Sequence, residues 1–479
     1  MRSFVRTLAL LTGVLLAARP AAAQSWTPPI GIPSPTFGIN EVAPAEPSPW
    51  NTAIAGFYFV CSTCSAATDS GNPNGHPGLP RTTIPNPIPA GSVVRLKGRL
   101  DGLVNIAASG TAGAPVFVRG VPNDRPTLTR EVETKGSTYL VLEHILFADR
   151  DGSEAGRLVI PGYSGASAHH VVLRDSEFTG NINRAGGLFV IGGASHVIFR
   201  NRLHDMGNLN DTGDQDSHCM ALGGTASEVW VVDNELARCS GDGLQINAGV
   251  NNNALAHHLY IGRNFAHHNK QTGIWSKNAS DVIISQNRFE DTAPSSSSTG
   301  ACSGTQYGPQ NVWWLFNTFQ RCTWGIAIQS TSGLGNGTHA YVIGNRMIGA
   351  MQRAVSLWPD SVRSVSVVNN TADASPLYIE TQNSTHTVEN NTTTSVYWGN
   401  GQGNSTARAN RSPGQATVDA GVVSAAYAAF QQRYGRSIAV DIEGRPRPQG
   451  AAWDIGAYEG VGPISTPSAP ANLRIVPGS

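Results

Sequence analysis

The side chains best suited to proton transfer in this sequence are a few lysines and histidines. Four of the 33 Lys and Arg residues are lysines, at positions 97, 135, 270 and 277. An ammonium can lose its proton when it is desolvated or placed near other cations, whereas a guanidinium cannot. We therefore predict Lys277 as a general base and take Lys270, His268 and His218 as further acid or base candidates. The alternative is that Lys277 only hydrogen-bonds Asn247 and Gln329.

An acidic segment, Asp211-Thr-Gly-Asp-Gln-Asp216, supplies hard oxygen ligands. Asp214 and Asp216, with Asp242 further along the chain, are typical of the donors that bind Ca²⁺. The spacing differs from that of an EF-hand, so a solvated acidic turn is the alternative. We predict a calcium site formed by Asp214, Asp216 and Asp242.

Adjacent histidines occur at 169–170, 257–258 and 267–268. Neighbouring residues of a strand point to opposite faces, so the two histidines of a pair cannot coordinate the same metal ion. We expect stacked histidines at strand ends rather than zinc sites.

An internal repeat positions these residues. Short β-rich runs such as Val229–Val232 and Val282–Ile284 are each followed by an Asn, a turn and a second β-rich run. The Asn recurs at 201, 234, 264, 287, 317, 345 and 370. Uneven spacing fits coils from which loops of different length project. Stacked amides at one bend would hydrogen-bond each other, so we assign the Asn column to structure.

The second runs align as strands with alternating faces. Their second positions are Leu188, Cys219, Leu244, Ile274, Ile326 and Val355, all apolar and expected to point inward. The outward positions include Gln245, Asn247, Trp275, Lys277, Gln329 and Trp358. Hydrogen-bonding amides beside a flat ring suit a sugar. Parallel strands stacked along one axis predict an all-β fold, a right-handed parallel β-helix, and its outer face predicts a polysaccharide partner.

Over residues 91–400 the chain resembles the pectate-lyase-like right-handed β-helix proteins. The resemblance rests on the repeats, on an entry stretch at 110–120, and on an ending, 441–447 with 454–459, similar to one common in secreted bacterial β-helix proteins. It looks like the calcium-dependent lyases that use a lysine base. The resemblance implies β-elimination on a uronic-acid polymer, with Ca²⁺ on the acidic residues and Lys277 as the base.

Three other functions stay open. The segment 241–247 and Ser276-Lys277 look like diluted polygalacturonase motifs, and Asp216 with Asp242 would then be the two carboxyl groups of a hydrolase. Position 243 is Gly where that family has a second Asp. A C5 epimerase shares the proton abstraction without the elimination. A β-helix that only binds glycans needs no catalytic residue.

Composition sets the remaining limits. The 479 residues include 33 basic and 33 acidic side chains, so net charge implies no nucleic-acid partner. With 53 Gly and 29 Pro the chain must turn often, which excludes coiled coils and helical bundles, while 40% apolar content excludes disorder. Six cysteines suit an oxidising compartment, and we consider the pairs Cys61/Cys64, Cys219/Cys239 and Cys302/Cys322.

The predicted organisation has five parts. Residues 1–23 read as a bacterial signal peptide, which predicts a secreted, periplasmic or cell-surface protein. No later run reaches 18 apolar residues, so we expect no membrane span. Residues 24–90 form an extended segment and cap, 91–400 the β-helix, 401–460 a capping segment with a helix near 422–433, and 461–479 a Pro/Ser-rich tail. We expect a monomer.

Overall fold

The computed structural model describes residues 26–148, 157–162, 167–180, 186–213, 215–247, 256–329, 338–358, 362–380 and 385–460. The predicted signal peptide, the predicted tail at 461–479 and Asp214 lie outside these residues.

The strands assemble into three sheets in which every pair is parallel. The first sheet contains β1 (Phe57–Val60), β2 (Val93–Leu96), β5 (Val116–Arg119), β8 (Thr138–Glu143), β11 (His169–Arg174), β14 (Ala194–Phe199), β17 (Ser227–Val232), β20 (His257–Gly262), β23 (Ser280–Ser285), β26 (Gln310–Leu315), β29 (Thr338–Ile343), β32 (Val362–Val368), β35 (Thr387–Glu389) and β38 (Thr406–Arg408). The second contains β3 (Arg99–Leu100), β6 (Thr127–Leu128), β9 (Leu146–Ala148), β12 (Glu177–Thr179), β15 (Arg202–Met206), β18 (Glu235–Cys239), β21 (Phe265–His267), β24 (Arg288–Thr292), β27 (Thr318–Cys322), β30 (Arg346–Ile348), β33 (Thr371–Ala372) and β36 (Thr392–Thr393). The third contains β4 (Val104–Asn105), β7 (Val132–Glu133), β10 (Leu158–Ile160), β13 (Leu188–Val190), β16 (Met220–Gly223), β19 (Leu244–Asn247), β22 (Ile274–Lys277), β25 (Ala301–Gln306), β28 (Trp324–Ile328), β31 (Arg353–Leu357), β34 (Leu377–Glu380) and β37 (Val396–Gly399).

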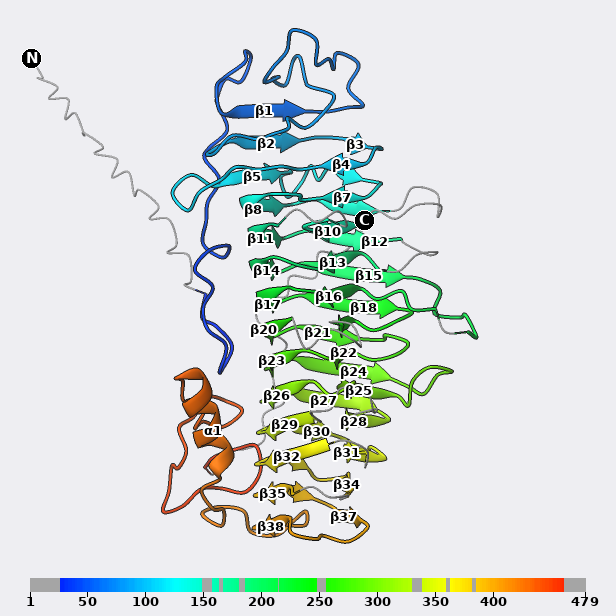
Figure 1. Cartoon of the computed structure of the whole chain (residues 1–479), viewed down its shortest axis with the longest axis vertical. Coiled ribbons are helices and arrows are strands. Elements are labelled where there is room, and N and C mark those ends of the chain that lie inside the picture. The colour runs from blue at the N-terminus through cyan, green and yellow to red at the C-terminus, as the bar shows by residue number, and fades with distance from the viewer. Residues whose placement is uncertain are drawn as a thin grey trace, which may run out of the picture.

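Successive coils stack along one long axis, as Figure 1 shows. The predicted all-β parallel β-helix is therefore confirmed, and parallel crossovers of this kind are right-handed. Two features differ from the sequence prediction. Each full coil has three strands rather than two, and the stacked strands extend beyond 91–400, from β1 to β38.

Apolar side chains from all three sheets fill the interior. The predicted inward residues Leu188, Leu244 and Ile274 have no exposed surface. Aromatic rings stack from coil to coil inside, with centroids 4.2 Å apart for Phe147 and Phe178. This continuous core, shared by neighbouring coils, holds the stack together because no single coil buries its own apolar face.

The Asn column forms a hydrogen-bonded ladder at the bend between the first and second sheets. The Nδ2 atom of Asn264 donates to Oδ1 of Asn287 at 2.9 Å, and Nδ2 of Asn287 donates to Oδ1 of Asn317 at 3.0 Å. The ladder includes the seven predicted positions and continues through Asn391 and Asn410. The structural interpretation of these residues is confirmed.

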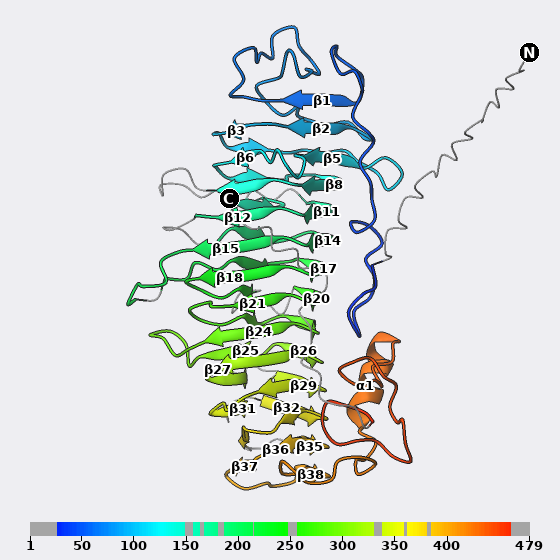
Figure 2. The ribbon, with the colours of Figure 1, turned by 180° about the vertical axis from the view of Figure 1, so that it is seen from behind.

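The outer face of the first sheet is covered by other parts of the chain. The segment from Trp26 runs along it, where Trp230 Nε1 donates to the carbonyl oxygen of Pro33 at 2.7 Å. The helix α1 (Ala425–Tyr434) lies beside the same sheet, with Phe430 against Trp313, rather than closing an open end (Figure 2). Within the described ranges no helix has the length and apolar character to cross a bilayer.

All three considered cysteine pairs are disulfides: Cys61–Cys64, Cys219–Cys239 and Cys302–Cys322. The latter two each span 20 residues and link the third sheet's side of one coil to the end of a second-sheet strand in the next. Cys219 and Cys302 lie in the two coils that flank the coils carrying β19 and β22.

Candidate functional site

The outer face of the third sheet brings several predicted site residues together. Strand pairing aligns Asn247 of β19 with Lys277 of β22, and Gln245 with Trp275. These positions alternate with Leu244, Ile246 and Ile274, which point into the core. The prediction that Gln245, Asn247 and Lys277 share one outer face is confirmed.

The alignment of the neighbouring strands needs two corrections. Met220, not Cys219, is the partner of Leu244. The strand β25 was missed, so Gln306 is the neighbour of Lys277 and Gln329 lies one strand further along. The strand escaped detection because its inward residues are Ser303 and Thr305, whose hydroxyls donate to backbone carbonyls of adjacent coils.

The spacing of the cysteines in the sequence indicates the correct register. Cys219 precedes Met220 and Cys302 precedes Ser303, and the register places Met220, Leu244, Ile274 and Ser303 in one column. Both cysteines therefore stand in the column of small residues that also holds Gly243 and Gly273. Equal disulfide spans of 20 residues mark two equivalent coils.

Trp275 is not the open stacking platform that we expected. Only 8% of its surface is exposed, and it packs with Ala301, Trp324 and Ala327. Its indole lies so close to Gly304 that a Cβ atom there would come within 2.3 Å of the ring. Trp358, by contrast, is 43% exposed.

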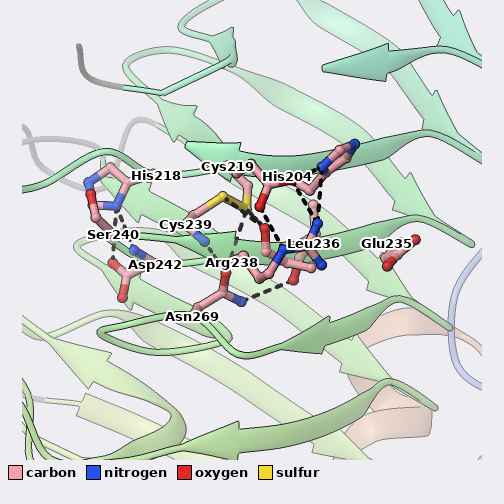
Figure 3. The surroundings of a disulfide bond; sticks show 12 residues. His204, His218, Cys219, Glu235, Leu236, Arg238, Cys239, Ser240, Asp242 and Asn269 are labelled. Carbon is pink, nitrogen blue, oxygen red and sulfur yellow. Dashed lines mark hydrogen bonds and ion pairs between the residues drawn. A yellow bond between two sulfur atoms is a disulfide. The ribbon is translucent and has the colours of Figure 1, made fainter. Parts of the chain in front are cut away.

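A series of hydrogen bonds runs from the residues before β19 to Asn247, which lies next to Lys277 in the sheet. The backbone N–H of Asp242 donates to His218 Nδ1 at 2.9 Å, as Figure 3 shows beside the Cys219–Cys239 disulfide. Asp242 Oδ2 accepts from Gln245 Nε2 at 3.1 Å, and Gln245 Oε1 accepts from Asn247 Nδ2 at 3.3 Å. We call His218, Asp242, Gln245, Asn247 and Lys277 the polar row.

The polar row is largely buried although it belongs to the outside of the helix. His218, Asp242 and Gln245 each expose less than a tenth of their surface. Because His218 Nδ1 accepts a hydrogen bond, the neutral ring carries its proton on Nε2. The 3.6 Å approach of Nδ1 to Asp242 Oδ2 is an ion pair only if the ring is protonated.

A long loop after β15 is fastened beside the polar row. Lys270 Nζ donates to the carbonyl oxygens of Asp211 and Gly213, both at 2.7 Å. Asp216 Oδ1 accepts from Gln271 Nε2 at 2.6 Å. Lys270, a predicted catalytic residue, and Asp216, a predicted metal ligand, thus hold this loop in place.

Lys277 contrasts with Lys135 and Lys270. Its side chain is half-buried, and its ammonium lies 6.0 Å from the centroid of the Tyr307 ring. In the part of the chain that the structure describes, Lys277 makes no ion pair or side-chain hydrogen bond, whereas Lys135 pairs with Glu133. Its ammonium is therefore available to a ligand.

His268 lies away from the polar row. It follows β21 of the second sheet, its side chain is 57% exposed, and its Nε2 lies 3.4 Å from Asp291 Oδ2. Its Nδ1 lies 2.8 Å from Nδ1 of His267, so the expectation that adjacent histidines point apart is wrong. The second residue of each pair has a positive φ, 55° at His268, which turns both rings to one side.

The described members of the predicted calcium site are hydrogen-bonded to neighbouring side chains. Asp242 accepts hydrogen bonds on both oxygens, from Thr272 at 2.5 Å and from Gln245, and Asp216 is bonded to Gln271. Among the residues that the structure describes, no three His, Cys, Asp or Glu side chains gather as a metal site would require. Asp214 lies outside them.

Comparison with known proteins gives likeness in structure only. No known family model matches the chain, and no curated protein matches it. Pectate lyase Pel9A aligns at 13% identity over 84% of this chain and 96% of its own, with a TM-score of 0.38. Its three all-parallel sheets make the chain a parallel β-helix protein. The A-module of mannuronan C-5 epimerase AlgE6 from Azotobacter vinelandii aligns at 16% identity over 68% of this chain and 92% of its own, with a TM-score of 0.47. GH136 lacto-N-biosidase from Eubacterium ramulus aligns at 13% identity, over 71% and 67%, with a TM-score of 0.42. We draw no activity from these likenesses.

Proposed function

We propose that this β-helix binds a uronic-acid-containing polysaccharide on the outer face of the third sheet and cleaves it by β-elimination, with Lys277 as the base. One observation carries the proposal. The Lys277 ammonium stands in the polar row between Asn247 and Gln306 with no carboxylate partner among the described residues.

The reaction needs a base and donors for a carboxylate. Lys277 takes the proton from C5, the electron pair forms the C4–C5 double bond, and the C4–O glycosidic bond breaks as its oxygen takes up a proton. Negative charge accumulates on the uronate carboxylate during this step. The amides of Asn247 and Gln306 are positioned next to Lys277 to donate hydrogen bonds to that charge.

Asp242 and His218 act as positioning residues in this proposal. Asp242 accepts from Gln245 Nε2, which fixes the Gln245 amide so that its oxygen faces Asn247 Nδ2. The contact of the His218 ring with the Asp242 backbone holds the turn before β19. Neither group needs to touch the substrate. The deep burial of Asp242 weighs against a hydrolase that uses it as an open carboxyl group.

Export belongs to the same proposal. Three disulfides support folding in an oxidising compartment, where an extracellular polymer is met. The signal peptide at 1–23 and the monomeric state remain predictions.

The test is an activity panel on the exported chain. Pectate, alginate and glycosaminoglycans are incubated with it, and the ultraviolet absorbance of the unsaturated uronate is followed beside new reducing ends. We expect both signals together on one polymer. Lys277→Ala should lose them, and Lys97→Ala, at an exposed site near the N-terminal coils, should keep them. Reducing ends without the absorbance would establish a hydrolase, and inverted C5 centres by NMR without cleavage would establish an epimerase.

A further inference from the structure

The same outer face carries an aromatic group four coils C-terminal to the one with the polar row's Asn247. Trp324 of β28 and Tyr378 of β34 contact Arg353 of β31. Trp358 after β31 and Tyr397 of β37 pack against those two rings. We propose that this Arg353 cluster is a second glycan-binding site that holds the carboxylate of an anionic sugar. The inference rests on the proposed function for its substrate class, because both sites would bind one acidic polymer.

Arg353 is held in place without an acidic partner. Its guanidinium carbon lies 3.8 Å from the Tyr378 ring centroid and 4.6 Å from that of Trp324. One N–H group donates to Ser356 Oγ at 2.9 Å. Among the described residues no carboxylate pairs with it, unlike Arg174, which pairs with Glu143.

This arrangement suits a planar anion. A guanidinium has five N–H donors in a fixed fork that matches a carboxylate, and the described residues provide a hydrogen-bond partner for one of them. Ring contacts fix the orientation of the fork before a ligand arrives, which lowers the entropy lost on binding. The structure therefore offers a prepared, unsatisfied anion receptor on the surface.

Exposed rings beside Arg353 suit the rest of a sugar. Trp358 is 43% exposed and Tyr397 51%, and they are the aromatic members of the exposed large apolar side chains of the described residues. Trp358 lies 6.2 Å from Trp324 between ring centroids. An apolar sugar face can stack on such rings, while the carboxylate reaches the guanidinium.

The cluster is within reach of a polymer bound at Lys277. Strands β22, β25, β28 and β31 are successive neighbours, so three inter-strand spacings of about 4.8 Å separate the two sites by about 14 Å. The apolar cluster of Trp275, Ala301, Trp324 and Ala327 fills the surface between them. A chain lying along the helix axis would contact both.

The experiment measures binding by calorimetry with oligogalacturonate and with the same oligosaccharide after reduction of its carboxyl groups. All proteins carry Lys277→Arg so that the ligand stays intact. Arg353→Gln should weaken binding of the acidic ligand by roughly 10- to 100-fold, the range for a hydrogen bond to a charged group, and leave the reduced ligand unaffected. Trp358→Ala should weaken binding of both. Arg346→Gln is the matched control, because Arg346 contacts the Tyr458 ring on the second sheet's side.

Two further comparisons separate this inference from the proposed function. Arg353→Lys keeps the charge and should bind with intermediate affinity, which guards against a folding defect in the Gln variant. Equal affinity for the acidic ligand with and without Arg353→Gln in the Lys277→Arg protein would overturn the inference, as would equal affinity for acidic and reduced ligands or no binding at all. If no unsaturated product forms but binding depends on Arg353, the proposed function fails and the inference stands.

Discussion

The Asn ladder and the polar row are both lines of polar side chains that cross several coils, yet they differ in repetition. In the ladder every coil from Asn201 to Asn410 offers the same amide, and each Nδ2 donates to the next Oδ1. In the polar row each coil offers something different: His218, Asp242 with Gln245, then Lys277.

The difference separates framework from site. An amide that meets an identical amide in each neighbouring coil is fully used by the fold, and nothing remains for a ligand. Where the coils stop repeating, the polar groups differ from one coil to the next, and Lys277 has no acid partner in the described ranges. In a solenoid the break in the pattern therefore indicates where chemistry is located.

The largest effect should come from Lys277→Arg. The guanidinium keeps the charge but cannot act as a base, so turnover on the responsive polymer should fall by about 10²–10⁴-fold, the usual contribution of general base catalysis. Polymer affinity should change little. Steady-state rates and calorimetric affinity measured together check this. Unchanged turnover would mean that Lys277 contributes charge alone.

A substitution in the Asn ladder should lower stability and leave turnover nearly unchanged. Asn287→Ala removes the acceptor of both the backbone and side-chain N–H groups of Asn264 and the donor to the carbonyl oxygen of Ile261. Several buried groups lose partners, which should lower the free energy of unfolding by roughly 3–5 kcal/mol. Denaturant unfolding measures it. Turnover per folded molecule should stay near that of the unaltered protein. A large loss of turnover would contradict the distinction between the Asn ladder as framework and the polar row as site.

The two long disulfides give a matched pair. Each closes a 20-residue span, so replacing both cysteines with Ala should cost about 3 kcal/mol in either case. Cys219 adjoins His218, whereas Cys302 does not adjoin the polar row. We expect lower turnover per folded molecule only in the Cys219→Ala/Cys239→Ala variant. Equal turnover in the two variants would show that this disulfide does not position the row.

The smallest effect concerns pH and two buried framework histidines. Burial lowers the pKa of His196 and of His386 to about 4 from 6.5. Below pH 6.5 these two histidines become protonated in the unfolded chain, whereas in the folded chain they stay neutral until about pH 4. Stability should therefore be complete above pH 6.5 and fall as the pH decreases, by about 1.4 kcal/mol per pH unit for each histidine.

A variant and an ion pair sharpen this prediction. His386→Gln should reduce the slope of stability against pH between pH 6 and 4, whatever it does to the plateau. The ion pair of Asp205 with Arg238 should not contribute in that window, because the hydrogen bond from Arg238 lowers the pKa of Asp205 to about 2. An unchanged slope in His386→Gln would contradict the assignment of this pH dependence to buried His386.

The sequence predicted the repeating parts well and the exceptional parts poorly, for a physical reason. Apolar inward positions and the Asn column recur in every coil, so periodicity reveals them. β25 turns Ser303 and Thr305 inward and satisfies their hydroxyls on backbone carbonyls, which no hydrophobic pattern detects. The burial of Trp275 depends on Gly304 in that same strand. The capture of Lys270 by two carbonyl oxygens depends on the path of a loop.

The most direct test locates the bound polymer. Hydrogen exchange of the Lys277→Arg chain is followed by mass spectrometry with and without the uronate oligosaccharide that the unaltered protein binds most tightly. The account predicts slower exchange in peptides covering 207–213, 270–279 and 301–309, with no change in peptides that carry the Asn ladder alone. Protection confined to the first or second sheet, or protection nowhere, would contradict the assignment of the site to the polar row.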